Sequence, residues 1–392
     1  MTVLPRNLIR VAFASFVTNS ATWLYRLTTS YFIWEATKSG AMLSLLAVAE
    51  FLPNLVVTPY AGIISDRIRL KRSSYVICGL LGLLSLVAVL AVTVLPQDRF
   101  VFVIVVITAA MSTVSALSRT VHQKILGYVF TPQSIGRALS LNTISLNIGR
   151  VAAPTVLMGL ISQDLLWVSY FLNALSYAVV AYTTYAFDYA RQQGQAAAGR
   201  MNIHKAIGNG LRCLLEHRIL RQLLALAMVE AVCLSAFFEL LPMLSATYLG
   251  IAADLFTRIS ISIAVFSFIA GLLKLFSPVR LQAGLFPAAL LVAAGLVAGG
   301  LNSGSLVWAC LAFGLASFLI VLVRIGIVEL VHVEAPEHVK GQALGYYFLS
   351  ISGGGAAGAA VYGVLHDAGY GGFLPLVPII VFVGILALRA AR

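Results

Sequence analysis

Charged residues inside otherwise apolar stretches are the strongest candidates for chemistry in this sequence. A charge in a hydrocarbon environment is expensive, so it is kept mostly where it binds, carries or pairs with something. Glutamates in such positions can exchange protons, and arginines there can bind anions. The residues of this kind are Arg26, Glu50, Arg119, Arg150, Glu230, Glu239 and Arg324.

Depth separates these candidates. At 1.5 Å of rise per residue, Arg150 lies about 21 Å and Glu230 about 13 Å inside the inner ends of their apolar segments, near the middle of a bilayer. We expect Glu230 or Glu50 to exchange a proton, and Arg150, Arg26 or both to bind an anionic group of a substrate. Structural ion pairing is the alternative for each of them.

The segment that carries Arg150 also contains Asn147, Gly149, Pro154 and Gly159. Proline and small residues make a helix that bends and packs closely against its neighbours. We therefore include Asn147 with Arg150 among the candidates for substrate or proton coupling.

The elements that must hold these residues follow from composition. Of 392 residues, 60% are hydrophobic and 10% are charged, against roughly 25% charged in soluble domains. This composition excludes a soluble globular protein and predicts an all-α membrane protein. Twelve apolar segments are long enough to span a bilayer; they cover residues 8–34, 41–64, 74–95, 100–121, 137–161, 165–187, 221–249, 254–277, 281–300, 305–331, 341–365 and 371–389.

The net charge of +12 reflects membrane orientation rather than a nucleic-acid partner. With both termini in the cytoplasm, nineteen Lys and Arg residues fall on the inner side, and only Lys38, Arg99 and Arg258 fall on the outer side. This bias predicts a multi-pass protein of a bacterial inner membrane with cytoplasmic termini.

A weak internal repeat appears at an offset of 205 residues. Gly136-Arg-Ala-Leu aligns with Gly341-Gln-Ala-Leu, and Arg119 aligns with Arg324. The repeat predicts two pseudo-symmetric six-helix halves, at residues 1–187 and 221–392. Between them, residues 188–220 form a polar linker that contains a predicted amphipathic helix.

Other chemistries find no support in the sequence. The four cysteines have no metal-ligand spacing, and no phosphate-binding loop or catalytic constellation is present. The GxGxxG-like run at residues 353–358 lies in an apolar segment without the strand that a dinucleotide site requires. We expect no enzyme activity, no cofactor and no bound metal.

The loop after the second segment carries a recognisable motif. It runs from Gly62 through Asp66 and Arg67 to Lys71 and Arg72, and it resembles the signature loop of the major facilitator superfamily. Arg69 stands where that family usually has glycine. The resemblance implies a major facilitator fold, with Gly62, Asp66, Arg67 and Arg72 in a gating motif that contacts the region of 336–341. Arg119 and Arg324 are inner-gate candidates or anchors that reach the membrane surface.

Within that superfamily, the sequence resembles the branch of enterobactin-type siderophore exporters and macrolide efflux pumps. This resemblance implies a secondary active exporter that works by alternating access and proton antiport. Its implied partners are a small molecule, protons and the lipid bilayer, and it is expected to act as a monomer. Four arginines within spans favour a siderophore or similar anionic metabolite. The alternatives are multidrug or macrolide-type efflux, an uptake permease and a receptor that does not transport.

Overall fold

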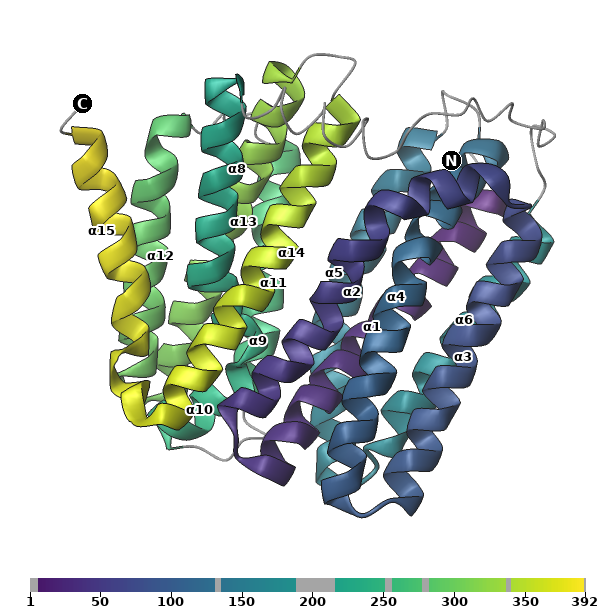
Figure 1. Ribbon diagram of the computed structural model, residues 1–392, viewed down its shortest axis with the longest axis horizontal. Helices are drawn as coiled ribbons and strands as arrows, with labels where there is room; N and C mark the ends of the chain where they lie inside the picture. Colours follow the sequence, from purple (N-terminus) through teal and green to yellow (C-terminus); the bar gives the residue numbers. More distant parts are fainter. Residues whose placement is uncertain are drawn as a thin grey trace. The chain divides into compact units, whose positions relative to one another are not determined.

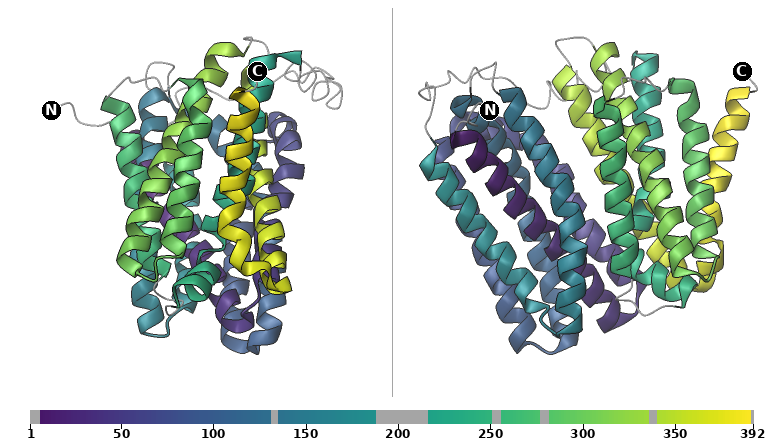
Figure 2. Two further views of the ribbon diagram at one scale, coloured as in Figure 1. Left: turned by 90° about the vertical axis from the view of Figure 1, so that its left-hand side faces the viewer. Right: turned by 180° about the vertical axis from the view of Figure 1, so that it is seen from behind.

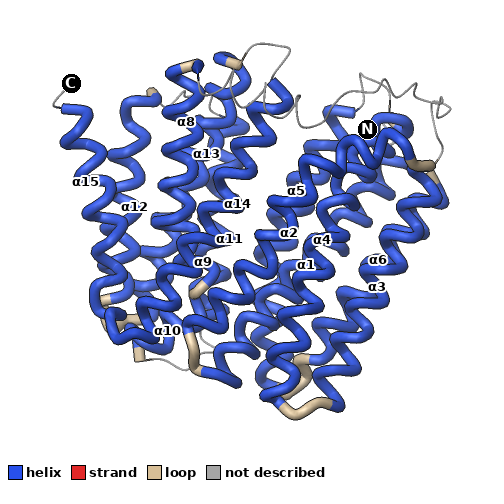
Figure 3. Tube along the Cα trace, in the orientation of Figure 1, coloured by secondary structure: helices blue, strands red, loops and turns tan. Residues whose placement is uncertain are grey.

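The computed structural model describes residues 6–130, 135–187, 216–250, 256–276, 282–335 and 340–390. Helices make up nearly all of these ranges, and no strand occurs within them (Figure 3). Each of the twelve predicted apolar segments is helical where it is described, which confirms the all-α fold. The predicted amphipathic helix in the linker lies outside the described residues.

The chain divides into two compact units. Unit 1 contains residues up to Phe32 together with Leu52–Met201, and unit 2 contains Ile33–Phe51 together with Asn202–Arg392. The long helices α1 (Arg6–Thr37) and α2 (Gly40–Arg67) therefore contribute to both units, because the hairpin that joins them groups with unit 2.

Unit 1 is completed by four helices, and α3 packs along α4 and α6 within it (Figures 1 and 2). Polar side chains inside this packing bond one another or their own backbone, as when Asn173 donates to the Ser85 hydroxyl at 3.0 Å. These helices are α3 (Leu70–Val94), α4 (Gln97–Val129), α5 (Ile135–Ser162) and α6 (Trp167–Ala186).

Unit 2 contains a larger number of shorter pieces. They are α8 (Arg218–Glu230), η1 (Ala231–Ser235), α9 (Ala236–Glu239), α10 (Leu241–Leu249), α11 (Phe256–Phe276), η3 (Ala283–Leu285), α12 (Phe286–Leu301), α13 (Leu306–Glu334), α14 (Lys340–Leu365), η5 (His366–Tyr370), η6 (Gly371–Leu376) and α15 (Val377–Ala390). Helix α13 packs against α11 and α12, and α14 packs against α8 and η1.

The segment predicted at 221–249 is not one regular helix. The α-helix α8 passes into a π-helical turn, η1, before α9 and α10 continue the crossing. Helix α14 contacts this turn through glycine, because a Cβ atom added at Gly354 would lie 2.8 Å from the Cβ atom of Ala231. Such π-turns are rare in proteins, and those that occur often lie at functional sites.

Seven described segments are long and apolar enough to cross a membrane, and Ile148–Ser162 and Phe286–Leu301 are shorter apolar helices. The last of the seven, Gly345–Leu388, is 44 residues long and contains two crossings, α14 and α15, joined by the turn at residues 366–376. The chain is thus a multi-pass membrane protein.

Candidate functional site

A buried ion pair lies beside the π-turn of unit 2. The guanidinium group of Arg324 on α13 donates to both carboxylate oxygens of Glu230 on α8, at 3.1 Å from Nε and 3.0 Å from Nη2. This two-point geometry is the strongest way in which arginine binds a carboxylate. The sequence analysis placed Glu230 at a coupling site and Arg324 at an inner gate, and the structure brings the two side chains together.

The π-turn supplies the third member of this cluster. Ser235 lies five residues after Glu230, and its hydroxyl donates to the Glu230 carboxylate at 3.0 Å. Arg324 Nη2 also donates to the Ser235 hydroxyl oxygen. A π-turn places residues five apart one above the other, so this local departure from the α-helix aligns Ser235 with Glu230.

The two charges differ in their exposure. The Glu230 side chain is 1% exposed, whereas that of Arg324 is 30% exposed. Another group can therefore approach the arginine, while the carboxylate is reached mainly through its partner. Glu239, on α9, is a second acid whose charge acts on Arg324.

Two arginines in unit 1 lie beside one tryptophan. The Cζ atoms of Arg26 and Arg150 are 4.6 Å and 4.8 Å from the centroid of the Trp23 ring. Contacts of guanidinium groups with an indole ring are favourable, and here one ring holds two positive charges. An anion with two or more charged or polar oxygens would complement this arrangement, here called the arginine–tryptophan cluster.

Close approach of α1 and α5 creates the arginine–tryptophan cluster. A Cβ atom added at Gly149 would lie 2.9 Å from the backbone nitrogen of Ser20, so only glycine fits there without a shift. The Ser145 hydroxyl also donates to the carbonyl of Ala12 at 3.1 Å. Glycine at 149 thus brings the next residue, Arg150, to Trp23.

A turn directly after α14 in unit 2 is hydrogen-bonded to the start of α2. The Asp367 carboxylate accepts hydrogen bonds from the backbone N–H groups of Gly40 at 2.8 Å and Ala41 at 3.0 Å, and from the Ser39 hydroxyl at 2.6 Å. It therefore caps the N-terminus of α2 from a distant part of the chain, where a negative charge is favourable. We call Ser39, Gly40, Ala41, His366 and Asp367 the Asp367 cap.

His366 extends this contact. Its Nδ1 atom lies 3.1 Å from Oδ1 of Asp367, its Nε2 atom lies 3.1 Å from the Thr247 hydroxyl, and its ring meets Trp34 edge to face. Burial raises the pKa of Asp367, but the hydrogen bonds from Ser39, Ala41, His366 and Gly40 outweigh this effect and lower the pKa to about 2. The cap is thus ionised throughout the physiological pH range.

The remaining predicted residues are dispersed. In unit 1 Arg119 donates to the side-chain oxygen of Asn54, whose amide donates to the Ser112 hydroxyl at 2.7 Å. Glu50 is partly buried on the part of α2 that belongs to unit 2, and Arg72 is exposed near the start of α3. The side chains of the gating residues Gly62, Asp66 and Arg67, and that of Asn147, lie outside the described part of the structure.

Sequence reasoning missed three contributors to these sites: Trp23, Ser235 and Asp367. Ser39 directly before Gly40 is the signal of a helix start that could have drawn attention to the Asp367 cap. No local signal marks Ser235, because its role depends on the π-turn.

Comparison with known proteins gives a consistent result. The model of the Major Facilitator Superfamily matches residues 11–359 of the chain. No curated protein sequence matches it.

Solved structures match over nearly the whole length. The crystal structure of the nucleoside transporter NupG has a TM-score of 0.74 at 14% identity and covers 99% of each chain. A bacterial homolog of the human lysosomal transporter Spinster, inward-facing and unoccupied, has a TM-score of 0.72 at 14% identity and covers 95% of this chain and 85% of that one. The D-xylose-proton symporter gives 0.65 at 13% identity, covering 96% and 94%. These identities establish the fold alone.

We predict that breaking the buried ion pair costs more stability than removing both of its members. Arg324→Met leaves the Glu230 carboxylate without its partner and should destabilise the protein by about 3–5 kcal/mol, and Glu230→Leu/Arg324→Met should recover most of this loss. Thermal unfolding of the purified variants measures both effects.

The Lys274–Glu329 pair serves as the control for this experiment. It joins α11 and α13 at 3.0 Å, and its glutamate side chain is 47% exposed. Lys274→Met should therefore cost no more than about 1 kcal/mol. A double variant at Glu230 and Arg324 that is as unstable as Arg324→Met would contradict the role assigned to the pair.

A second prediction concerns the Asp367 cap. Asp367→Asn removes the charge at the N-terminus of α2 and should cost about 0.3–1 kcal/mol, the usual range for a charge at a helix terminus. Because the pKa of Asp367 is lowered to about 2 from 3.8, its contribution is complete above pH 4 and is lost as the pH falls toward 2.

Thermal unfolding between pH 8 and pH 2 tests this prediction. The wild-type protein and the Asn variant should differ by a constant amount above about pH 4 and by progressively less as the pH falls toward 2. Asp164→Asn is the matched control, since Asp164 is exposed and has a positive φ of 56°, which asparagine also adopts. Equal losses in the two variants would show that the cap contributes nothing specific.

Proposed function

Since the chain belongs to the Major Facilitator Superfamily, a family of multi-pass membrane transporters of small molecules, we propose that it is a proton-coupled exporter of small organic anions. A siderophore or a similar anionic metabolite is the proposed substrate. The observation that carries this proposal is the arginine–tryptophan cluster, in which two guanidinium groups lie within 5 Å of the Trp23 ring centroid.

Anion recognition follows from the chemistry of the arginine–tryptophan cluster. Guanidinium groups bind carboxylates through parallel N–H donors, and the indole ring keeps the two groups in place while offering an apolar surface. A metabolite that combines an aromatic or apolar part with carboxylate or catecholate oxygens would satisfy both features. Cationic drugs would be repelled by the same charges, which ranks multidrug efflux second.

Glu230 is the proposed proton carrier. Its carboxylate is almost completely buried, and Arg324 and Ser235 hold it by hydrogen bonds. Proton uptake by Glu230 would release Arg324 to bind another acid, such as Glu239, whose charge already acts on it. A change of protonation would thereby alter contacts between α8 and α13, as coupling to a conformational change requires.

We predict that loss of the transporter causes an anionic metabolite to accumulate inside cells. Untargeted mass spectrometry of medium and cell extract should compare a deletion strain with its complemented parent, under iron limitation and repletion. A metal-chelating metabolite retained in the deletion strain under iron limitation is the expected result. Complementation with Arg150→Gln or Trp23→Leu should restore less than about a tenth of export, because each removes a charged or positioning contact to the anion.

Arg99→Gln is the control, because Arg99 is exposed in the first turn of α4. It should export normally. Identical metabolite profiles, combined with altered sensitivity to cationic drugs, would overturn the anion proposal in favour of drug efflux. A metabolite depleted from the cells of the deletion strain would instead indicate uptake.

A further prediction concerns Glu230 and the proton. In proteoliposomes, Glu230→Gln should abolish accumulation of the exported metabolite driven by a pH gradient and keep exchange of labelled for unlabelled metabolite, because the amide cannot release a proton. Retained exchange also shows that the variant is folded.

Asp98→Asn, at an exposed carboxylate in the first turn of α4, should leave both activities unchanged. Accumulation that still follows the pH gradient in Glu230→Gln would exclude Glu230 as the proton carrier.

A further inference from the structure

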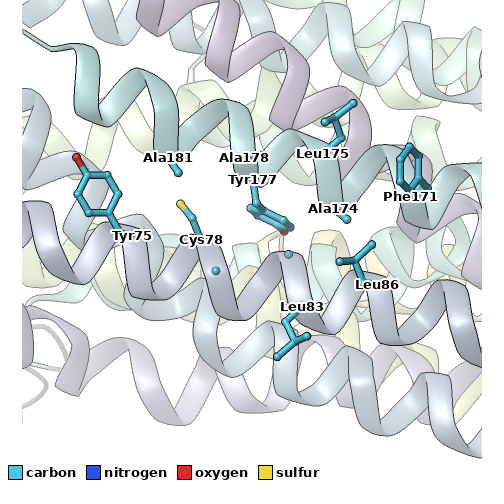
Figure 4. Close-up of a pocket in the computed structure, with 12 residues that line it drawn as sticks. Tyr75, Cys78, Leu83, Leu86, Phe171, Ala174, Leu175, Tyr177, Ala178 and Ala181 are labelled. Atoms are coloured by element: carbon cyan, nitrogen blue, oxygen red, sulfur yellow. The ribbon is translucent and has the colours of Figure 1, made fainter.

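An apolar groove runs along the surface of unit 1 between α3 and α6. It has a volume of about 470 Å³, and Figure 4 shows residues from both helices along it, from Tyr75 at one end to Phe171 at the other. No residue of the arginine–tryptophan cluster lines it, so the proposed transport site does not account for it.

Small residues make the groove concave. Gly79 and Gly82 on α3 face Ala174, Ala178 and Ala181 on α6 across it. A Cβ atom added at Gly79 would meet nothing within 4 Å, so open space lies above this glycine. The floor is closed by buried residues such as Cys78 and Tyr177, which are 5% and 7% exposed.

Larger apolar side chains form the rims. Leu83 and Leu86 on α3 are 57% and 47% exposed, and Phe171 and Leu175 on α6 are 44% and 51% exposed. Water would solvate this surface poorly, whereas hydrocarbon chains solvate it well. The groove is therefore suited to a flexible apolar chain.

The length of the groove matches one leaflet of a bilayer. From Tyr75 to Leu86 the α3 helix rises by about 16 Å at 1.5 Å per residue. One leaflet contributes about half of a hydrocarbon core that is roughly 30 Å thick. An acyl chain that enters at one end of the groove would thus extend along its whole length.

The Tyr75 end of the groove is positively charged. Arg69, Lys71 and Arg72 precede Tyr75, and the Lys71 Nζ atom lies 5.2 Å from the centroid of the Tyr185 ring on α6. Tyr182 and Tyr185 are 70% and 69% exposed, and tyrosines at such positions are typical of the membrane–water boundary. A negatively charged headgroup would find basic partners there.

We propose that this groove binds an anionic phospholipid of the surrounding bilayer, with one acyl chain between α3 and α6 and the phosphate near Lys71 and Arg72. A second groove of about 450 Å³ lies on the other side of α6. It is lined by Ile9, Arg10 and Phe13 of α1 and by Ala178, Val179, Tyr182 and Thr183 of α6. Ala178 borders both grooves. The second acyl chain has a place there, so the lipid straddles α6.

Photolabelling tests this proposal. The purified full-length protein is reconstituted with phosphatidylglycerol that carries a photoreactive diazirine in one acyl chain, and in parallel with the corresponding phosphatidylcholine. Mass spectrometry should locate the label on α3 and α6 residues of the groove, with phosphatidylglycerol labelling several-fold above phosphatidylcholine. Lys71→Ala/Arg72→Ala should remove this preference.

Larger side chains that fill the groove should displace the acyl chain of the lipid. Gly79→Leu from α3 and Ala178→Leu from α6 should each lower labelling about tenfold, since each displaced methylene weakens binding roughly fourfold. Gly159→Leu is the matched control, because Gly159 is exposed on α5 and also has open space above it. It should label like the wild type, and thermal unfolding confirms that each variant is folded.

Three results would overturn the proposal. The first is labelling that both groove-filling variants leave unchanged. The second is equal labelling by the two lipids. The third is a dimer on native mass spectrometry that Gly79→Leu converts to a monomer, which would assign the groove to a second copy of the chain.

Discussion

Hydrocarbon offers no hydrogen bonds, and this constraint decides which polar groups the chain can keep within its spans. Several buried hydroxyl groups of the described residues bond within their own helices, as when Thr29 and Ser85 donate to backbone carbonyl groups four residues earlier. Others pair across helices, such as Tyr25 with Thr108 at 2.9 Å. Burying a charged group costs more free energy than burying a hydroxyl group. Charges persist where another side chain meets them with defined geometry, and these places are the candidate sites.

Stability alone does not explain why the chain keeps the Glu230–Arg324 ion pair. Well-packed apolar residues of similar volume often do as well as a buried ion pair, because desolvation offsets most of the attraction. The helix around the pair is also irregular, since the π-turn at η1 gives up regular α-helical hydrogen bonding to align Ser235 with Glu230. A pair that combines a costly charge with an irregular helix is better explained by a role in coupling than by folding.

Hydropathy and charge bias predicted the membrane-spanning helices, because both depend on composition averaged over about 20 residues. The family followed from a short local motif, the loop from Gly62 to Arg72. The sequence also singled out the charged residues of the two clusters, since a charge in an apolar run is visible without a structure. It could not identify their partners. Glu230 and Arg324 are 94 residues apart, and the π-turn leaves no mark in the hydropathy pattern. Trp23 carries no charge that would mark it in an apolar run, and Gly149 brings Arg150 to it only through tertiary packing. The contact of Asp367 with the start of α2 likewise depends on the fold.

The proposed antiport requires that the proton and the anion be able to load separately. If an anionic substrate had to replace Glu230 as the partner of Arg324, substrate and proton would bind together and move in the same direction. Glu239 removes this requirement, because it offers Arg324 a second acid within the same unit when Glu230 is protonated. The arginine–tryptophan cluster belongs to the other unit, where Arg26 and Arg150 lie beside Trp23. A proton and an anion therefore have separate sites, so each can load without the other. Exchange of one against the other further requires that only the singly loaded carrier crosses, which is a negative coupling between the two sites.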